Sequence, residues 1–436
     1  MPDVWNTEKL AELDKRHLWH PFTQMRDWCD PGHEPLILVR GEGAMLEDSR
    51  GRRYLDGNSS IWTNIHGHSH PHITRAVHEQ LDLVSHVSFL GTTNAPSIRL
   101  AERLCDFFPK NTLTRAFLSD DGSTAIEAAM KMAVQFHQLT GNPHRSGFVA
   151  FDNAYHGDTL GAASIGGIGT FHKKIEGHKF PVHRISDPEE LDALPAWREG
   201  LIAAAAIEPL IQGAAGMRTW PKGLLSRLRK KCNEAGVFLI LDEVMTGFGR
   251  TGTMFACQQE QVIPDFLCLA KGLSGGYMPL AATLTTEKIF EAFLGDFSEG
   301  KTFYYGHSYS GNPLGCAAAL ANLEVFEKES TLENLQPKIQ KLTSLLDQLR
   351  VVPQVHEIRQ CGFIAGIDIG RPDGTKLPWQ ERTGARICLA ARNHGLLTRP
   401  ILDTLVFIPP LCTTEAQLES GISALERAIQ EVSGPS

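Results

Sequence analysis

The sequence predicts an α/β fold: a large domain built on a mostly parallel sheet, and a smaller α/β domain toward the C-terminus. Short apolar runs rich in branched and aromatic residues alternate with longer segments of helical periodicity, as in strands buried between two layers of helices. The chain has 436 residues, of which 42% are hydrophobic and 21% charged. Such a chain is globular, and at this length it usually divides into domains.

Six apolar runs are expected to form strands of the large sheet. They are 115–118, 147–151, 201–207, 237–241, 266–270 and 280–284. The pattern then changes to an amphipathic helix at 335–349, a strand at 362–369, a helix at 384–394, a strand at 404–408 and a closing helix. We therefore expect a large domain at 66–330 and a small C-terminal domain at 331–436, preceded by an N-terminal segment, 1–65.

Charge and composition favour a cytoplasmic protein that acts on small molecules. The formal net charge is −8 with Lys and Arg scattered along the chain, so no basic surface for nucleic acid or an anionic membrane is expected. The N-terminus lacks the apolar core of a signal peptide, and no apolar run approaches the roughly 20 residues that span a bilayer. The nine cysteines form no C-x-x-C pair, which suits reduced thiols.

Chemically useful residues follow the predicted strands at their carboxyl ends, where open parallel sheets bind ligands. A glycine, an aromatic residue, an acid and a lysine come after successive strands: Gly122, Tyr155, Asp242 and Lys271. Thr124 and Glu127 have capping-box spacing, so a helix is expected to begin near Gly122 and Ser123 and to offer free N–H groups to an anion. A plain helix cap with a turn glycine is the alternative.

Lys271 ends one apolar run and Asp242 ends the preceding one, 271 − 242 = 29 residues earlier. A lysine at the end of a buried strand must be solvated, paired or used chemically, because an unpaired buried ammonium is costly. A structural ion pair with Asp242 is one explanation. The other is a Schiff base with a carbonyl cofactor.

The segments LILDEVMTGFGRTG (239–252) and PDFLCLAKGLSGG (264–276) resemble the signature of the class-III aminotransferases, and the similarity extends over nearly the whole chain. The resemblance implies the fold type I of pyridoxal 5'-phosphate (PLP)-dependent transferases, with PLP as cofactor. It implies that Gly122 and Ser123 cradle the phosphate and that Tyr155 stacks on the ring near the substrate. It also implies that Asp242 pairs with the pyridinium nitrogen and that Lys271 holds the cofactor and moves the substrate proton.

The same resemblance implies a homodimer with active sites at the subunit interface. Gly306, His307 and Ser308 match a segment that reaches the substrate and phosphate of the neighbouring subunit. Family members commonly carry threonine at the position of Ser308, and serine retains the hydroxyl. By the same comparison, the N-terminal segment contributes to the small domain and the active site.

Flanking segments such as HLWHPFTQM, NAYHGDTLGA and LLTRP resemble the family members that convert 8-amino-7-oxononanoate to 7,8-diaminononanoate in biotin biosynthesis. Arg399 then binds the substrate carboxylate, and Ile61 and Trp62 line the substrate site. Typical members carry tyrosine at Phe22 and tryptophan at Ile61, so both S-adenosylmethionine and lysine stay open as amino donor. Another class-III ω-aminotransferase, acting on a diamine or ω-amino acid, is the alternative. Met245 disfavours it, since many such enzymes carry glutamine there.

Two further motifs suggest other chemistry. The histidines at 66, 68, 70 and 72 have the alternation of a metal site on a strand, although the family has a structural G-H-x-H-P element here. The glycine-rich run 164–169 hints at dinucleotide binding but lacks the full G-x-G-x-x-G spacing. A PLP-dependent aminomutase remains a third possibility. We expect no metal ion.

Overall fold

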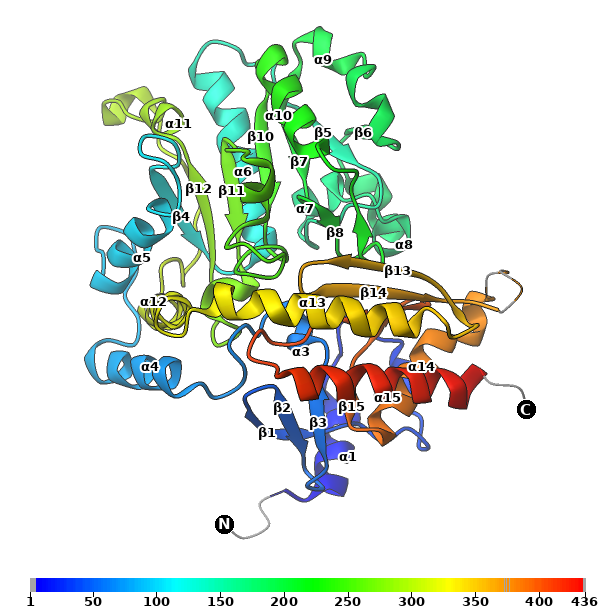
Figure 1. The fold of residues 1–436 in the computed structure, drawn as a ribbon. Coiled ribbons are helices and arrows are strands. Elements are labelled where there is room, and N and C mark those ends of the chain that lie inside the picture. The colour runs from blue at the N-terminus through cyan, green and yellow to red at the C-terminus, as the bar shows by residue number, and fades with distance from the viewer. Residues whose placement is uncertain (1–4, 372, 374, 376, 434–436) are drawn as a thin grey trace.

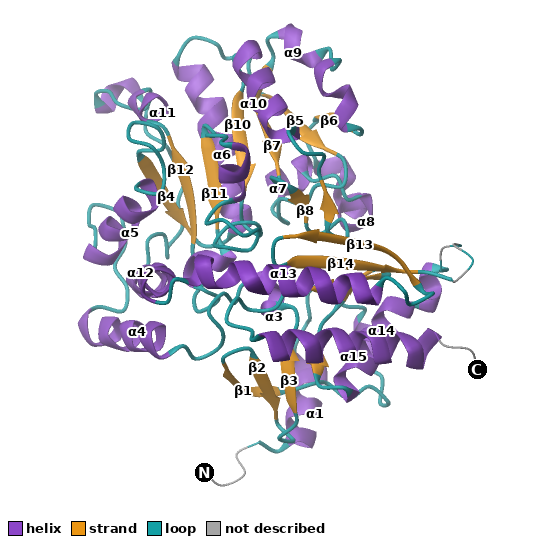
Figure 2. Ribbon diagram, in the orientation of Figure 1, coloured by secondary structure: helices purple, strands orange, loops and turns teal. Residues whose placement is uncertain are grey.

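A seven-stranded sheet forms the centre of the protein (Figures 1 and 2). The computed structural model describes residues 5–371, 373, 375 and 377–433. The strands run in the order β4-β12-β11-β10-β7-β5-β6. Their bounds are β4 Arg115–Ser119, β5 Gly147–Phe151, β6 His183–Ile185, β7 Ile202–Ile207, β10 Phe238–Asp242, β11 Phe266–Leu269 and β12 Ala281–Thr285.

The predicted sheet is confirmed as mostly parallel, with one inverted strand. β11, β10, β7, β5 and β6 pair in parallel, whereas β12 is antiparallel to both β11 and β4. All six predicted strands exist. The edge strand β6 was not predicted, because three residues are too few to show an alternating pattern.

Alternate residues of the central strands pack against helices on opposite faces of the sheet. Ile240 packs in a cluster with α6 (Gly122–Leu139), whereas Leu239 and Leu241 pack in the cluster that contains α10 (Leu224–Ala235) and α5 (Ala95–Cys105). This division follows from the two-residue period of a strand. Both faces are covered, which explains why the strands read as continuous apolar runs.

Two smaller sheets lie below the large sheet in the view of Figure 1. One has the order β1-β2-β3-β15 and the other β13-β14-β17-β16. Their strands are β1 Leu38–Glu42, β2 Met45–Asp48, β3 Arg53–Asp56, β13 Val355–Cys361, β14 Ile364–Ile369, β15 Leu396–Leu397, β16 Pro400–Ile401 and β17 Thr404–Phe407. A two-stranded ribbon is formed by β8 Ile211–Gln212 and β9 Arg218–Thr219.

The N-terminal segment and the C-terminal part share the first of these sheets. Leu55 of β3 pairs in parallel with Leu396 of β15. The predicted C-terminal elements correspond to α13 (Thr331–Leu349), β14, α14 (Thr383–Asn393), β17 and α15 (Glu415–Ser433). Strand β13 was not predicted. The domain limits at residues 65 and 330 stay a prediction.

The remaining helices connect these layers. They are α1 Thr7–His17, α2 Met25–Trp28, α3 Ser59–Trp62, α4 Pro71–Leu83, α7 Leu160–Ile165, α8 Gly169–His172, α9 Ala196–Glu199, α11 Glu287–Glu291 and α12 Pro313–Lys328. Within the described residues, no helix is long and apolar enough to cross a membrane.

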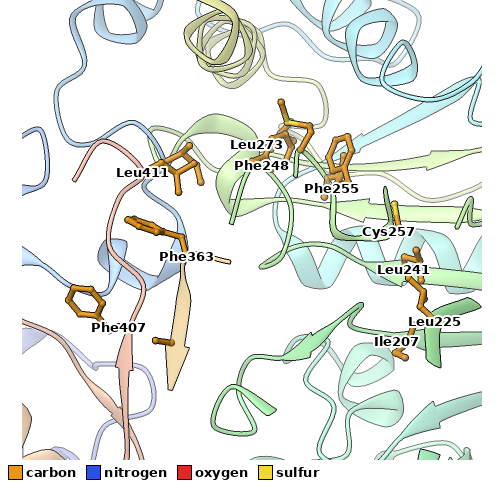
Figure 3. Packing of buried hydrophobic residues seen from close by; sticks show 14 of the residues in the cluster. Ile207, Leu225, Leu241, Phe248, Phe255, Cys257, Leu273, Phe363, Phe407 and Leu411 are labelled. Atoms are coloured by element: carbon orange, nitrogen blue, oxygen red, sulfur yellow. The ribbon is translucent and has the colours of Figure 1, made fainter. Parts of the chain in front are cut away.

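One apolar cluster extends from the large sheet into the small ones. It includes Leu241 of β10, Phe255 and Phe248 in the loop after it, and Phe363 and Phe407 of the C-terminal part (Figure 3). Because this cluster crosses from one sheet to the other, the loop that follows Asp242 is held from both sides.

Candidate active site

A cavity of about 450 Å³ opens at the carboxyl ends of the central strands. Its wall gathers the residues that the sequence placed after successive strands, together with part of the N-terminal segment. The wall comprises Trp62, Thr63, Asp120, Asp121, Gly122, Ser123, Tyr155, His156, Gly157, Glu208, Asp242, Val244, Met245, Ala270, Lys271, Ser274, Gly276, Tyr277, Met278, Pro279 and Leu280. The residues that follow these successive strands therefore meet at one cavity, as expected where the carboxyl ends of parallel strands converge.

Helix α6 begins at this cavity, as predicted, but its cap differs from the prediction. The carboxylate of Asp121 accepts from the backbone N–H of Thr124 at 2.9 Å, and the hydroxyl of Thr124 accepts from the N–H of Asp121 at 3.0 Å. The capping box is thus formed by Asp121 and Thr124. Glu127, expected in that box, instead accepts from the hydroxyl of Thr159 at 2.6 Å, which ties α6 to α7.

The helix end is shaped for close approach of an anion. A Cβ on Gly122 would lie 2.7 Å from a methyl group of Val244, so no side chain fits at this position. The first N–H groups of a helix have no partner within the helix and carry the positive end of its dipole. Ser123 adds a hydroxyl beside them, and Oγ accepts from the N–H of Asp158 at 3.2 Å.

Asp242 is the last residue of β10 and is buried as a hydrogen-bonded carboxylate. Nδ1 of His156 donates to its Oδ2 at 2.7 Å, and the N–H of Val244 donates to its Oδ1 at 3.1 Å. The other ring nitrogen of His156 is buried and has no partner among the described residues. These two donors hold the carboxylate at one orientation on the cavity wall.

Lys271 follows β11 and has a left-handed backbone, with φ +46°. Its Nζ lies 4.6 Å from the centre of the Trp62 ring. Burial lowers the pKa of Lys271 to about 8, although the charges of Asp242 and Glu208 act in the opposite direction. An amine with this pKa is partly uncharged near neutral pH, so it is available both as nucleophile and as base.

Glu208 is a further acidic residue on the cavity wall and is only 6% exposed. It accepts from the backbone N–H of Tyr155 at 3.0 Å and from that of Gly213 at 2.9 Å. Burial, reinforced by the charge of Asp242, raises the pKa of Glu208 to about 7. Glu208 thus connects the loop that carries Tyr155 to the loop that carries Gly213. These two contacts could not be predicted from the position of Glu208 after a strand.

Tyr155 is held by its hydroxyl as well as by its backbone. The hydroxyl donates to Oδ2 of Asp158 at 2.6 Å. Burial, together with this carboxylate, raises the pKa of Tyr155. The phenol is therefore neutral and acts as a donor. Sequence reasoning missed the role of Asp158, although its place three residues after Tyr155 in the same loop was a usable signal.

Five of the predicted site residues do not reach the wall that the described residues of one chain form. These are Ile61, Gly306, His307, Ser308 and Arg399. Ile61 and Arg399 are exposed. Nδ1 of His307 lies 2.9 Å from Oδ2 of Asp120, a residue of the wall, and the carbonyl oxygen of Ser308 accepts from His86 at 2.8 Å. Trp62, by contrast, is buried against Lys271 and Met245.

Residues 29–429 match the family Aminotransferase class-III. The chain belongs to the class-III aminotransferases.

The similarity to other proteins extends over almost the whole length of this chain. An adenosylmethionine-8-amino-7-oxononanoate aminotransferase of Nitratidesulfovibrio vulgaris is 48% identical over 97% of this chain and 82% of its own. One of Geobacter sulfurreducens is 44% identical over the full length of both. The crystal structure of such an enzyme from Methanocaldococcus jannaschii has a TM-score of 0.95 at 42% identity, covering 98% of this chain and 99% of its own.

As a class-III aminotransferase, the protein is a PLP-dependent enzyme of fold type I, and the residues on the cavity wall fit this cofactor. The α6 end, where Gly122 leaves room for no side chain, suits the phosphate. The buried carboxylate of Asp242 would suit a protonated ring nitrogen, and the amine of Lys271, with its lowered pKa, would suit the aldehyde.

The histidine tract has separate protein partners. Nε2 of His66 donates to the carbonyl oxygen of Asn322, while His68, His70 and His72 each lie within 3.0 Å of a different carboxylate. Among the described residues, no three His, Cys, Asp or Glu side chains are grouped to hold a metal ion. The tract connects α4 and the N-terminal segment to α12.

Proposed function

We propose that this aminotransferase converts 8-amino-7-oxononanoate to 7,8-diaminononanoate in biotin biosynthesis, with S-adenosylmethionine as amino donor. The observation that carries the proposal is the 48% identity, over 97% of the chain, to a protein with the corresponding name. The cavity agrees with it. Trp62, Met245, Met278, Pro279 and Leu280 give the wall an apolar surface suited to the aliphatic chain of this acceptor.

PLP, when bound, withdraws electrons from the substrate bond that breaks. In the proposed assignment, the α6 end with Gly122 and Ser123 binds its phosphate, and Tyr155 stacks on its ring. Asp242 keeps the ring nitrogen protonated, supported by the hydrogen bonds that fix its carboxylate.

Lys271 both attaches the cofactor and moves a proton in this proposal. Its lowered pKa of about 8 leaves a usable fraction of free amine at neutral pH. With cofactor and substrate bound, Nζ would be a base tethered beside the substrate. Trp62 lies against the same amine and restricts where it can move.

Substrate recognition is assigned to Arg399, Trp62 and Ile61, of which Trp62 lies on the cavity wall. Arg399 is exposed and offers a bidentate fork to the acceptor carboxylate. Trp62 and Ile61 are assigned to the substrate side of the site. Because Ile61 is aliphatic, lysine remains the competing donor.

The active site is proposed to be completed by a second copy of the chain, in a homodimer. Gly306, His307 and Ser308 lie outside the wall of their own cavity and are flanked by the exposed aromatic side chains of Tyr304 and Tyr309. Exposed aromatic side chains at one segment favour a protein interface. The nine cysteines are all free, which supports a cytoplasmic location.

The test is product formation by the purified protein with PLP. We expect 7,8-diaminononanoate, detected by mass spectrometry, from 8-amino-7-oxononanoate and S-adenosylmethionine, with none from the Lys271→Ala variant. Lysine replaces S-adenosylmethionine in a parallel reaction, and the faster donor is the physiological class.

A second candidate has structural support. An (S)-enantioselective ω-transaminase of Thermomicrobium roseum has a TM-score of 0.92 at 31% identity, covering 98% of this chain. If diamines or ω-amino acids are converted and 8-amino-7-oxononanoate is not converted with either donor, the biotin-pathway assignment is wrong and this candidate replaces it.

A further inference from the structure

We propose that His172 is a positioning residue that acts through Asp158 to orient the Tyr155 hydroxyl and the Ser123 side chain. The inference rests on the proposed function only in assigning Tyr155 and Ser123 to the cofactor. His172 belongs to α8 and is not on the cavity wall, so its effect on the bound molecules must be transmitted by other residues.

Asp158 connects the three side chains. Its Oδ2 accepts from the hydroxyl of Tyr155 at 2.6 Å, and its Oδ1 lies 3.1 Å from Nε2 of His172. Its backbone N–H donates to Oγ of Ser123 at 3.2 Å. The carboxylate of Asp158 thus accepts hydrogen bonds from Tyr155 and His172. The backbone N–H of Asp158 binds Ser123 at the proposed phosphate site.

The histidine is the fixed end of this chain of hydrogen bonds. His172 is 4% exposed, whereas the side chain of Asp158 is half exposed. A carboxylate oxygen accepts hydrogen bonds, so Nε2 of His172 is the donor in this contact. Nδ1 is buried and has no partner among the described residues, so the contact to Asp158 is the polar interaction that this ring makes.

The rings add a second contact between α8 and Tyr155. The imidazole of His172 lies nearly parallel to the phenol, with an interplanar angle of 13° and centroids 6.3 Å apart. Phe171 meets the same phenol edge-on, at 87° and 5.9 Å. Two successive residues therefore limit the rotation of Tyr155 about its side-chain bonds.

The glycine-rich run before α8 explains how His172 comes so close. The N–H of Gly167 donates to the carbonyl oxygen of Ala154 at 2.7 Å. A Cβ on Gly167 would lie 2.6 Å from the backbone nitrogen of Asn153, and one on Gly166 would lie 3.3 Å from the His172 ring. The run is thus a packing element that seats α8 against the loop carrying Tyr155, which accounts for the motif without a dinucleotide.

The experiment compares His172→Ala with His172→Gln, because the amide nitrogen of glutamine can replace Nε2 as a donor. PLP release from the holoenzyme is followed by its visible absorbance after dilution into a PLP trap. We expect release to be about tenfold faster in His172→Ala, as for a lost hydrogen bond to a charged group, and to return toward wild type in His172→Gln. Equal acceleration in both variants would overturn the proposal.

A matched control separates positioning from general loss of a buried imidazole. His137 is buried in the last turn of α6, at the opposite end of the helix from Gly122. We expect His137→Ala to lower the melting temperature and leave PLP release unchanged. If it accelerates release as much as His172→Ala, a general loss of stability explains the effect and the proposal fails.

A double-mutant cycle with Tyr155→Phe tests the route of transmission. We expect His172→Ala to slow amino transfer from the donor about tenfold in the wild-type background and less than about twofold in Tyr155→Phe. The same loss in both backgrounds would refute transmission through the hydroxyl. Release of PLP requires neither substrate, so inactivity toward 8-amino-7-oxononanoate would reject the proposed function and leave this test intact.

Discussion

The amino group of Lys271 lies 4.6 Å from the centre of the Trp62 ring, so a residue of the N-terminal segment contacts the lysine that follows β11. Trp62 itself is fixed by a hydrogen bond from its Nε1 to Oδ1 of Asn58 at 3.1 Å. The contact stabilises the ammonium form while burial favours the free amine. The two effects together leave an amine that changes charge near physiological pH.

Replacement of Lys271 by alanine is expected to abolish turnover without unfolding the protein. Near pH 7 the buried ammonium is held at a cost, so its removal relieves strain rather than opening the core. We expect a melting temperature within about 4 °C of wild type, and no borohydride-dependent attachment of PLP to the chain. Transamination at even about 1% of the wild-type rate would contradict the role of this lysine.

Glu208 gives the cofactor-free protein a stability that decreases with increasing pH. Its pKa is raised from 4.5 to about 7, so the folded state binds an extra proton between these values. The contribution is therefore complete below pH 4.5 and is lost as the pH rises through 7. Lys271 contributes a slope of the opposite sign as the pH approaches its folded pKa of about 8, because only the folded state loses its proton there.

Glu208→Gln is the variant that isolates this effect, because the amide cannot ionise. The free energy of unfolding of wild type minus that of Glu208→Gln should fall by about 2 to 3 kcal/mol between pH 5 and pH 8. Urea denaturation at both pH values measures it. A difference independent of pH would mean that Glu208 ionises normally.

Replacement of Arg399 by alanine tests the proposed carboxylate clamp. Loss of a charged hydrogen-bond pair is expected to raise KM for 8-amino-7-oxononanoate by about 10-fold to 150-fold. Amino transfer from the donor should change far less, since the donor half-reaction does not involve this carboxylate. An unchanged KM would reject Arg399 as the group that binds the carboxylate. Because Arg399 is exposed, the control is that the variant keeps the melting temperature of wild type.

Strand order explains why so much of the site was predictable from sequence. Long apolar runs ending in polar residues identify parallel strands, and the carboxyl ends of such strands converge. Asp242 and Lys271 could therefore be placed together before any coordinates. The cap at Asp121 was missed because Thr124 can serve as either member of a capping box, and only the path of α7 shows that Glu127 is used elsewhere.

Contacts between loops were not predictable in the same way. His172 and Asp158 are 14 residues apart, and nothing in their spacing indicates a hydrogen bond. The short strand β6 and the partly exposed β13 carry too little apolar periodicity to be recognised. The contacts between loops depend on how closely two backbone segments approach each other, as they do at Gly167. The sequence pattern does not encode this approach.

The choice of amino donor is expected to depend on Ile61, and Ile61→Trp is the variant that tests this. Ile61 is 41% exposed and lies in α3 next to Trp62, so an indole can be accommodated without entering the core. A second indole adds an apolar face and a cation–π partner for the sulfonium of S-adenosylmethionine. We expect its half-reaction to gain about 2-fold to 30-fold in kcat/KM. Lysine, whose ammonium must reach PLP, should gain little or lose. Single-turnover conversion of PLP to pyridoxamine phosphate with each donor measures both. If S-adenosylmethionine is already the faster donor and the substitution leaves its rate unchanged, Ile61 does not determine the donor.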